Sequence, residues 1–223
     1  MKNENSDSAF EFNQLYKTNN AIFGTSAEPL LKKYYTIIDK KLPVLDIGCG
    51  QGRNSFFLHD MGITVIPIDP SISAIESFQS HVSKKGIALQ SIPVSFSDFS
   101  PSHNHYSAIM VFGLIPVLSI DEIQLLVKKL RDWTKSKSII FISAFTTHDD
   151  SYDYWSNSGH RIGHHSYQLK NKQIRTFLKI NELISYFPEY EKIFQYEGFG
   201  PRHHHGNGIK ERHSISELVL RRI

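Results

Sequence analysis

Residues 44–54 read VLDIGCGQGRN, and this stretch decides the fold. A short apolar run ends in a glycine-rich turn, and a segment with helical spacing follows it. In this order, strand, turn and helix place backbone N–H groups and a helix N-terminus at the carboxyl edge of a parallel sheet. The stretch therefore predicts a loop that binds a small molecule in an α/β fold.

The rest of the chain alternates short β-branched runs with longer amphipathic stretches, which is typical of α/β layer folds. Strands are predicted over 42–48, 64–69, 88–95, 106–113 and 138–145, and helices over 53–61, 71–85 and 119–133. Ser71 and Ser119 are natural N-caps for the last two helices. A helix over 180–187 precedes two further strands, 190–198 and 214–223. We expect a doubly wound, mostly parallel, seven-stranded, Rossmann-like sheet that closes with an antiparallel pair.

Composition and length limit the possible functions. The 223 residues suit one domain, and the net charge of +3, from 25 Lys+Arg against 22 Asp+Glu, gives nucleic-acid binding no support. The longest apolar run, 107–118, is too short to span a membrane, and the N-terminus lacks an export signal, so we expect a cytoplasmic protein. The single cysteine, Cys49, excludes an internal disulfide and a multi-cysteine zinc site, and we expect no metal.

The glycine loop could hold a dinucleotide or another ligand. A dinucleotide fingerprint starting at Gly48 would need a small residue at position 53, which is Arg53. Asp46 would repel a pyrophosphate but would favour a cationic ligand. S-adenosylmethionine carries a sulfonium and an ammonium, and Asp69 at the end of the second strand could accept its ribose hydroxyls. The alternative is that the glycines only form a tight turn and Asp69 caps the next helix.

The stretch VLDIGCGQGRNSFFLHDMGITVIPIDPS, from residue 44, resembles motif I and its continuation in class I methyltransferases. In detail it resembles the tellurite-resistance methyltransferases, in which Arg-Asn-Ser follows the loop. The segments NELISYFPEYEKIFQYEGFG and GNGIKERHSISELVLRR resemble that family's closing helix and strand pair. The resemblance covers about residues 40–147 and 176–223. It implies a small-molecule methyltransferase that converts S-adenosylmethionine to S-adenosylhomocysteine, with a chalcogen oxyanion such as tellurite or selenite as acceptor.

The resemblance also assigns site residues. The expected cofactor contacts are Tyr16, Asp46, Gly48, Cys49, Gly50, Gly52, Asn54, Asp69, Pro70, Ser95, Phe96 and Phe112. For the adenine, Ser95, Phe96 and Asp98 compete, because this chain reads VSFSDF where the family commonly has an aspartate. His203, His204 and Arg212 fall on or near the basic positions that would orient and neutralise the acceptor. The alternatives are a solvated histidine loop and a surface strand residue.

The chain divides into an N-terminal lid (1–35), a cofactor-binding core (36–147), a substrate-side insert (148–175) and a closing helix and strand pair (176–223). Tyr16 and Phe23 are candidates for covering the cofactor or for packing a helix on the core. The insert is rich in aromatic residues, which could line an acceptor pocket or pin the loop. Two alternatives stay open: a methyltransferase for an organic thiol, amine or hydroxyl, and a non-catalytic module that binds the cofactor or a metal.

Overall fold

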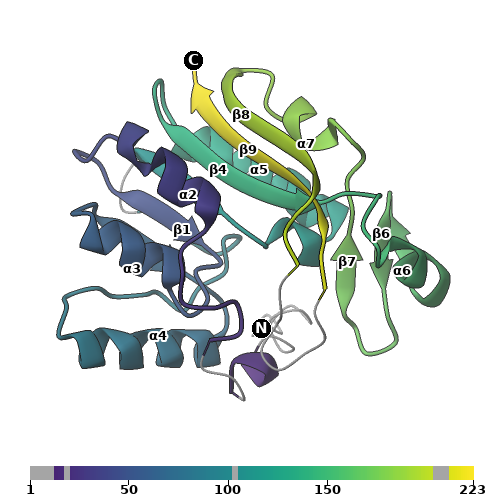
Figure 1. The fold of residues 1–223 in the computed structure, drawn as a ribbon, viewed down its shortest axis with the longest axis horizontal. Helices are drawn as coiled ribbons and strands as arrows, with labels where there is room; N and C mark the ends of the chain where they lie inside the picture. Colours follow the sequence, from purple (N-terminus) through teal and green to yellow (C-terminus); the bar gives the residue numbers. More distant parts are fainter. Residues whose placement is uncertain (1–12, 18–20, 102–104, 203–210) are drawn as a thin grey trace.

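The main sheet of the computed structural model has six strands in the order β2-β1-β3-β4-β9-β8 (Figure 1). The described residues are 13–17, 21–101, 105–202 and 211–223. The strands are β1 (Val44–Ile47), β2 (Val65–Ile68), β3 (Ala108–Val111), β4 (Ile139–Phe145), β8 (Tyr190–Phe199) and β9 (Ser214–Arg222). The first four are parallel, and β9 runs antiparallel between β4 and β8. The predicted Rossmann-like fold with a closing antiparallel pair is confirmed.

Helices cover both faces of this sheet. One face carries α2 (Pro29–Tyr34), which continues into η1 (Tyr35–Ile37), together with α3 (Arg53–Asp60) and α4 (Ile72–Lys85); the other carries α5 (Ile120–Trp133) and α7 (Glu182–Ser185). Strand β1 contributes side chains to the hydrophobic core on each face of the sheet, because Leu45 and Ile47 point to the α5 side and Val44 to the α2 side. None of the described helices is both long and apolar enough to cross a membrane.

Two serines begin helices as their positions predict. The Ser71 hydroxyl accepts a hydrogen bond from the Ala74 N–H at the start of α4. Ser119 forms a capping box with Glu122 at the start of α5, so two otherwise unpaired N–H groups are satisfied. These caps fix where the loops after β2 and β3 end, and both loops reach the carboxyl edge of the sheet.

The prediction of a strand over 88–95 is wrong. Only Ile92 pairs with β2, through an isolated bridge to Ile68 and a hydrogen bond from its N–H to the Pro67 carbonyl. Pro67 has no N–H to extend the ladder toward residue 90, and the Val94 N–H turns back across Pro93 to the Ile92 carbonyl. The ladder therefore stops after one residue, and the expected seventh strand is reduced to a bridge.

The substrate-side insert, in which no helix or strand is predicted from the sequence, forms regular secondary structure. It contains α6 (Tyr152–Ser158) and a second sheet of β5 (His160–Gly163), β6 (Ser166–Gln168) and β7 (Ile174–Thr176) (Figure 1). The turn between β5 and β6 places His165 at a positive φ of 51°, without the Asn-Gly or Asp-Gly pair that marks such turns in a sequence. The Thr176 hydroxyl donates to the Leu118 carbonyl, which ties this sheet to the segment before α5.

Candidate functional site

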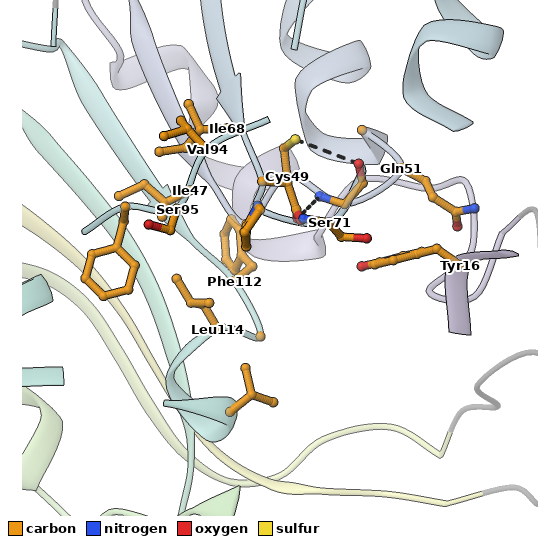
Figure 2. A pocket seen from close by; sticks show the side chains of 18 of the residues that line it. Tyr16, Ile47, Cys49, Gln51, Ile68, Ser71, Val94, Ser95, Phe112 and Leu114 are labelled. Carbon is orange, nitrogen blue, oxygen red and sulfur yellow. Dashed lines mark hydrogen bonds between the residues drawn. The ribbon is translucent and has the colours of Figure 1, made fainter. Parts of the chain in front are cut away.

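A cavity of about 520 Å³ lies at the carboxyl edge of the parallel strands. The loops after β1, β2 and β3 form its walls, as expected where the chain order reverses across a doubly wound sheet. Figure 2 shows Tyr16 and Gln51 on one side of the cavity and Ile47 and Ser95 on the other. The volume lies within the usual range for a small-molecule or cofactor site.

The loop after β1 turns on glycines. Gly48, Gly50 and Gly52 have φ values of 72°, 52° and 91°, a left-handed conformation that other residues rarely adopt. The Ile68 carbonyl accepts hydrogen bonds from the N–H groups of Gly48 and Cys49, at 2.9 and 3.0 Å, which fixes the loop to the end of β2. The turn leads directly into α3, so the positive end of that helix faces the cavity.

Asp69 is the most deeply buried of the three acids that line the cavity. One carboxylate oxygen accepts the Gly50 N–H at 2.9 Å, and the other accepts the Ser71 N–H at 2.8 Å. Burial raises the pKa of Asp69 to about 6, and these two hydrogen bonds oppose the rise. Each oxygen keeps a further lone pair, so the carboxylate is oriented to accept two neighbouring hydroxyls of a ligand.

Asp46 lies behind the loop and does not line the cavity. Its carboxylate accepts a hydrogen bond from the Ser55 hydroxyl at 2.5 Å. Burial raises the pKa of Asp46 to about 7, with the charge of Asp69 as a lesser cause. Its effect on a ligand would therefore be electrostatic, and its assignment as a cofactor contact stays a prediction.

Residues 53 and 54 hold the N-terminal segment against the loop. The Arg53 guanidinium donates to the Phe23 carbonyl at 3.1 Å and pairs with the Glu28 carboxylate. The Asn54 side-chain oxygen accepts the Glu28 N–H at 2.9 Å. The segment just before α2 is thereby fixed beside the glycine loop.

Tyr16 covers the loop from a helical turn at 13–17. Its hydroxyl lies so close to Gly50 that a Cβ at that glycine would be 2.7 Å from it. The rings of Tyr16 and Phe23 meet edge to face at 6.3 Å, and both residues line the cavity. Of the two roles considered for them, covering the cavity therefore fits better than packing on the core alone.

The opposite end of the cavity carries the groups considered for the adenine. Ser95, Phe96, Asp98 and Phe112 all line it. The Ser95 hydroxyl donates to the Asp98 carboxylate at 2.8 Å and accepts the Asp98 N–H, while Phe96 is buried in the core below. The Asp98 carboxylate can therefore accept further hydrogen bonds at this end, whereas the Ser95 hydroxyl already donates one and accepts one.

The structure brings most predicted cofactor contacts together. Eleven of the twelve line the cavity: Tyr16, Gly48, Cys49, Gly50, Gly52, Asn54, Asp69, Pro70, Ser95, Phe96 and Phe112. Burial raises the pKa of the Cys49 thiol, so this cysteine suits a packing role better than the role of a nucleophile.

The predicted catalytic residues are not placed at the cavity. His203 and His204 lie outside the described residues. Arg212 does not line the cavity; its Nε is 3.1 Å from Asp150 Oδ2, and its guanidinium stacks over the Phe199 ring at 4.0 Å. Among the described residues, no cluster of three or more histidine, cysteine or acidic side chains could hold a metal.

The aromatic residues of the insert pack on each other. Trp155 and Tyr167 are buried with Phe177, and Tyr152 joins them at their edge. None of these lines the cavity, and Tyr154 is largely exposed. Of the two roles considered for these aromatic residues, stabilising the insert by packing fits the geometry better than lining an acceptor pocket.

Sequence reasoning missed the apolar wall formed by Leu114, Val117 and Leu118 around η2 (Ile115–Val117). It also missed Gln51, whose side-chain oxygen accepts the Ile22 N–H at 3.2 Å. A run of apolar residues after a strand gives no sign that it will face a ligand. Gln51, however, stands inside the glycine loop and could have been included on position alone.

Comparison with known proteins agrees with this geometry. Residues 44–137 match the sequence model of a family described as "Methyltransferase domain". No curated protein sequence matches the chain. Among solved structures, TehB from Haemophilus influenzae is similar with a TM-score of 0.68 and 20% identity; the match covers 88% of this chain and 63% of TehB.

Two further structures are similar over most of both chains. A SAM-dependent methyltransferase from Methanosarcina mazei has a TM-score of 0.71 and 16% identity, covering 89% of this chain and 99% of its own. The 1,6-didemethyltoxoflavin-N1-methyltransferase of Burkholderia thailandensis, bound to its substrate and S-adenosylhomocysteine, has a TM-score of 0.67 and 12% identity, covering 97% and 87%. Residues 44–137 therefore match a methyltransferase domain, and the chain has the fold of these enzymes.

Proposed function

We propose that this chain is an S-adenosylmethionine-dependent methyltransferase that acts on a small molecule. The observation that carries the proposal is Asp69, a buried carboxylate oriented by the Gly50 and Ser71 N–H groups at the wall of a 520 Å³ cavity. This arrangement suits a ribose diol, and the matched family and similar folds are those of methyltransferases. The glycine loop agrees, because a side chain at position 50 would collide with Tyr16.

The residues present fit the cofactor. Asp69 would accept the ribose hydroxyls, the N-terminus of α3 would face the carboxylate of the methionine moiety, and Asp98 with Phe96 would face the adenine. When bound, the cofactor supplies an electrophilic methyl group. The chain's own contribution is to hold the acceptor close to that group and to exclude water, which Tyr16 and Phe23 support by covering the cavity.

The finer proposal of a chalcogen oxyanion acceptor rests on the resemblance to tellurite-resistance enzymes and on the similarity to TehB. It would require His203, His204 or Arg212 to bind the anion. Arg212 is already paired with Asp150, so an oxyanion would have to compete with that carboxylate. An organic acceptor is the second candidate, and it is favoured by the acidic and apolar groups near the cavity.

Calorimetric titration with S-adenosylmethionine and S-adenosylhomocysteine tests the cofactor. We expect binding of both, and we expect Asp69→Asn to weaken it at least tenfold, since a charged acceptor of two hydrogen bonds is lost. Absence of binding would refute the proposal. Methyl transfer from labelled cofactor to tellurite, selenite, thiols and amines then separates an enzyme from a non-catalytic binder, which would form no S-adenosylhomocysteine with any acceptor.

A further inference from the structure

The sheet face that packs against α2 is covered at its centre and open at one end. Phe141 on β4 and its partner Val219 on β9 are fully buried. One pair further along, Ser143 and its partner Glu217 are only half buried, although they lie on the same face. We call this surface the open shelf, and it consists of Ser143, Phe145, Ile215 and Glu217.

The open shelf adjoins the cavity. The Gly113 N–H, on the cavity wall, donates to the Ser143 hydroxyl at 3.1 Å. Directly opposed residues in an antiparallel pair have Cβ atoms about 5 Å apart. Glu217 is therefore the neighbour of Ser143, which itself contacts the cavity wall. Glu28, which Asn54 and Arg53 hold beside the glycine loop, lies near enough for its charge to act on Glu217.

The charge of Glu217 is not compensated within the described part of the chain. No described cation pairs with its carboxylate, whereas Glu28 is paired with Arg53. Burial raises the pKa of Glu217 to about 6, and the negative charge of Glu28 adds to the rise. A half-buried carboxylate of this kind would gain from a positively charged ligand, because the attraction is strong where water is partly excluded.

The neighbouring charges favour the same kind of ligand. Among the described residues lining the cavity, Arg53 is the one cation, whereas three carboxylates line it, those of Asp69, Asp98 and Glu122. The Phe145 ring already stacks on His213 and has the Arg175 guanidinium over it, so Glu217 is the group of the open shelf that would attract a cation. An oxyanion would meet repulsion here, whereas a cation would meet attraction.

Resting on the proposed function, we propose that Glu217 determines acceptor specificity and that the acceptor carries a cationic nitrogen, such as a protonated amine. The nitrogen lies on the open shelf, with the carboxylate of Glu217 as its counter-charge and Ser143 beside it. The charge recognised need not be on the atom that receives the methyl group.

The test compares a charged probe with a neutral one. The full chain is saturated with S-adenosylhomocysteine and titrated calorimetrically with 2-phenylethylamine, its neutral isostere 2-phenylethanol, and selenite. We expect the amine to bind about tenfold or more tightly than the alcohol, the strength of one charge-assisted contact. Glu217→Gln should remove this preference and leave the affinity for S-adenosylhomocysteine unchanged. Glu191→Gln, an exposed residue of β8 that pairs with Arg221, is the matched control and should change neither.

A second readout follows Glu217 itself. Its carboxyl carbon can be titrated by carbon-13 resonance, and the amine should lower its pKa whereas the alcohol should not. Equal binding of amine and alcohol, a preference that survives in Glu217→Gln, or a preference for selenite would overturn the inference. A lower melting temperature of Glu217→Gln would also overturn it, because another part of this chain would then supply the cation. Failure to bind S-adenosylhomocysteine would instead refute the proposed function.

Discussion

Replacing Gly52 by alanine probes whether the glycine loop is held by sterics as well as by backbone conformation. Gly52 has a φ of 91°, and a left-handed backbone costs a residue with a Cβ about 1–2 kcal/mol. The added Cβ would also lie 2.4 Å from Phe78 Cε2 and 2.8 Å from Phe56 Cε2. These two rings stack on each other at 4.7 Å, and Phe78 is fully buried, so neither can move away freely.

The expected loss of stability adds two contributions. Overpacking a core costs about 1–3 kcal/mol, so with the backbone cost Gly52→Ala should lose about 2–5 kcal/mol of unfolding free energy. For a domain of this size that corresponds to a fall in melting temperature of roughly 5 to 20 °C. Urea unfolding followed by circular dichroism measures the free energy directly.

Gly62 provides the matched control. It has a φ of 70°, but an added Cβ would meet no atom within 4 Å. Gly62→Ala should therefore show the backbone cost alone, about 1–2 kcal/mol. In a Phe78→Leu background, the extra cost of Gly52→Ala should shrink, and the double-mutant cycle isolates the steric part. Equal destabilisation by Gly52→Ala and Gly62→Ala would refute the steric argument.

Three further predictions concern charge. Affinity for S-adenosylhomocysteine should be constant above pH 6 and fall below it, because the pKa of Asp69 is about 6 and protonation removes a hydrogen-bond acceptor. Calorimetry at several pH values measures this affinity, and Asp69→Asn should show no such fall near pH 6. Burial alone would raise the pKa of Asp149, but hydrogen bonds, that of His213 first, outweigh it and lower that pKa. The ionised Asp149 carboxylate therefore stabilises the fold above pH 3.8, its ordinary pKa, and this stabilisation is lost as pH falls through the lowered pKa. Urea unfolding of Asp149→Asn should show a lower unfolding free energy at pH 7 and a weaker dependence of that free energy on pH in the acid range. Arg53→Lys keeps the charge but loses the fork that holds Glu28 and the Phe23 carbonyl, so S-adenosylhomocysteine affinity should fall about tenfold and hydrogen exchange over 21–28 should quicken.

Much of the fold could be predicted because local patterns and tertiary structure agree. The run before Gly48 is a strand buried on both faces, and Ser71 and Ser119 cap helices through contacts within three residues. The errors arose where a distant residue decides the outcome. Pro67 on the neighbouring strand removes the hydrogen bond that would extend the ladder toward residue 90, and no window around residues 88–95 contains that information.

The site could be predicted where a loop is defined by its own residues. Gly50 and Asp69 were identified because the glycine turn and the acid after the second strand recur at fixed positions in such folds. Glu217 could not be identified in this way. It is one acid in a strand of alternating residues, and its importance depends on Ser143, Gly113 and Glu28, which lie far away in the sequence.

The Arg-Asn-Ser tripeptide after the loop shows which properties can be inferred from a motif that two proteins share. Arg53 and Asn54 hold the segment around Glu28, and Ser55 binds the buried carboxylate of Asp46. These contacts build the cofactor end of the cavity, whereas the open shelf is formed by residues of β4 and β9 and is affected by the tripeptide only through the charge of Glu28. A protein that keeps this tripeptide should therefore keep its cofactor while its acceptor changes. For this chain the acceptor must be inferred from the surface around Glu217, so Glu217→Gln should alter acceptor choice at unchanged cofactor affinity.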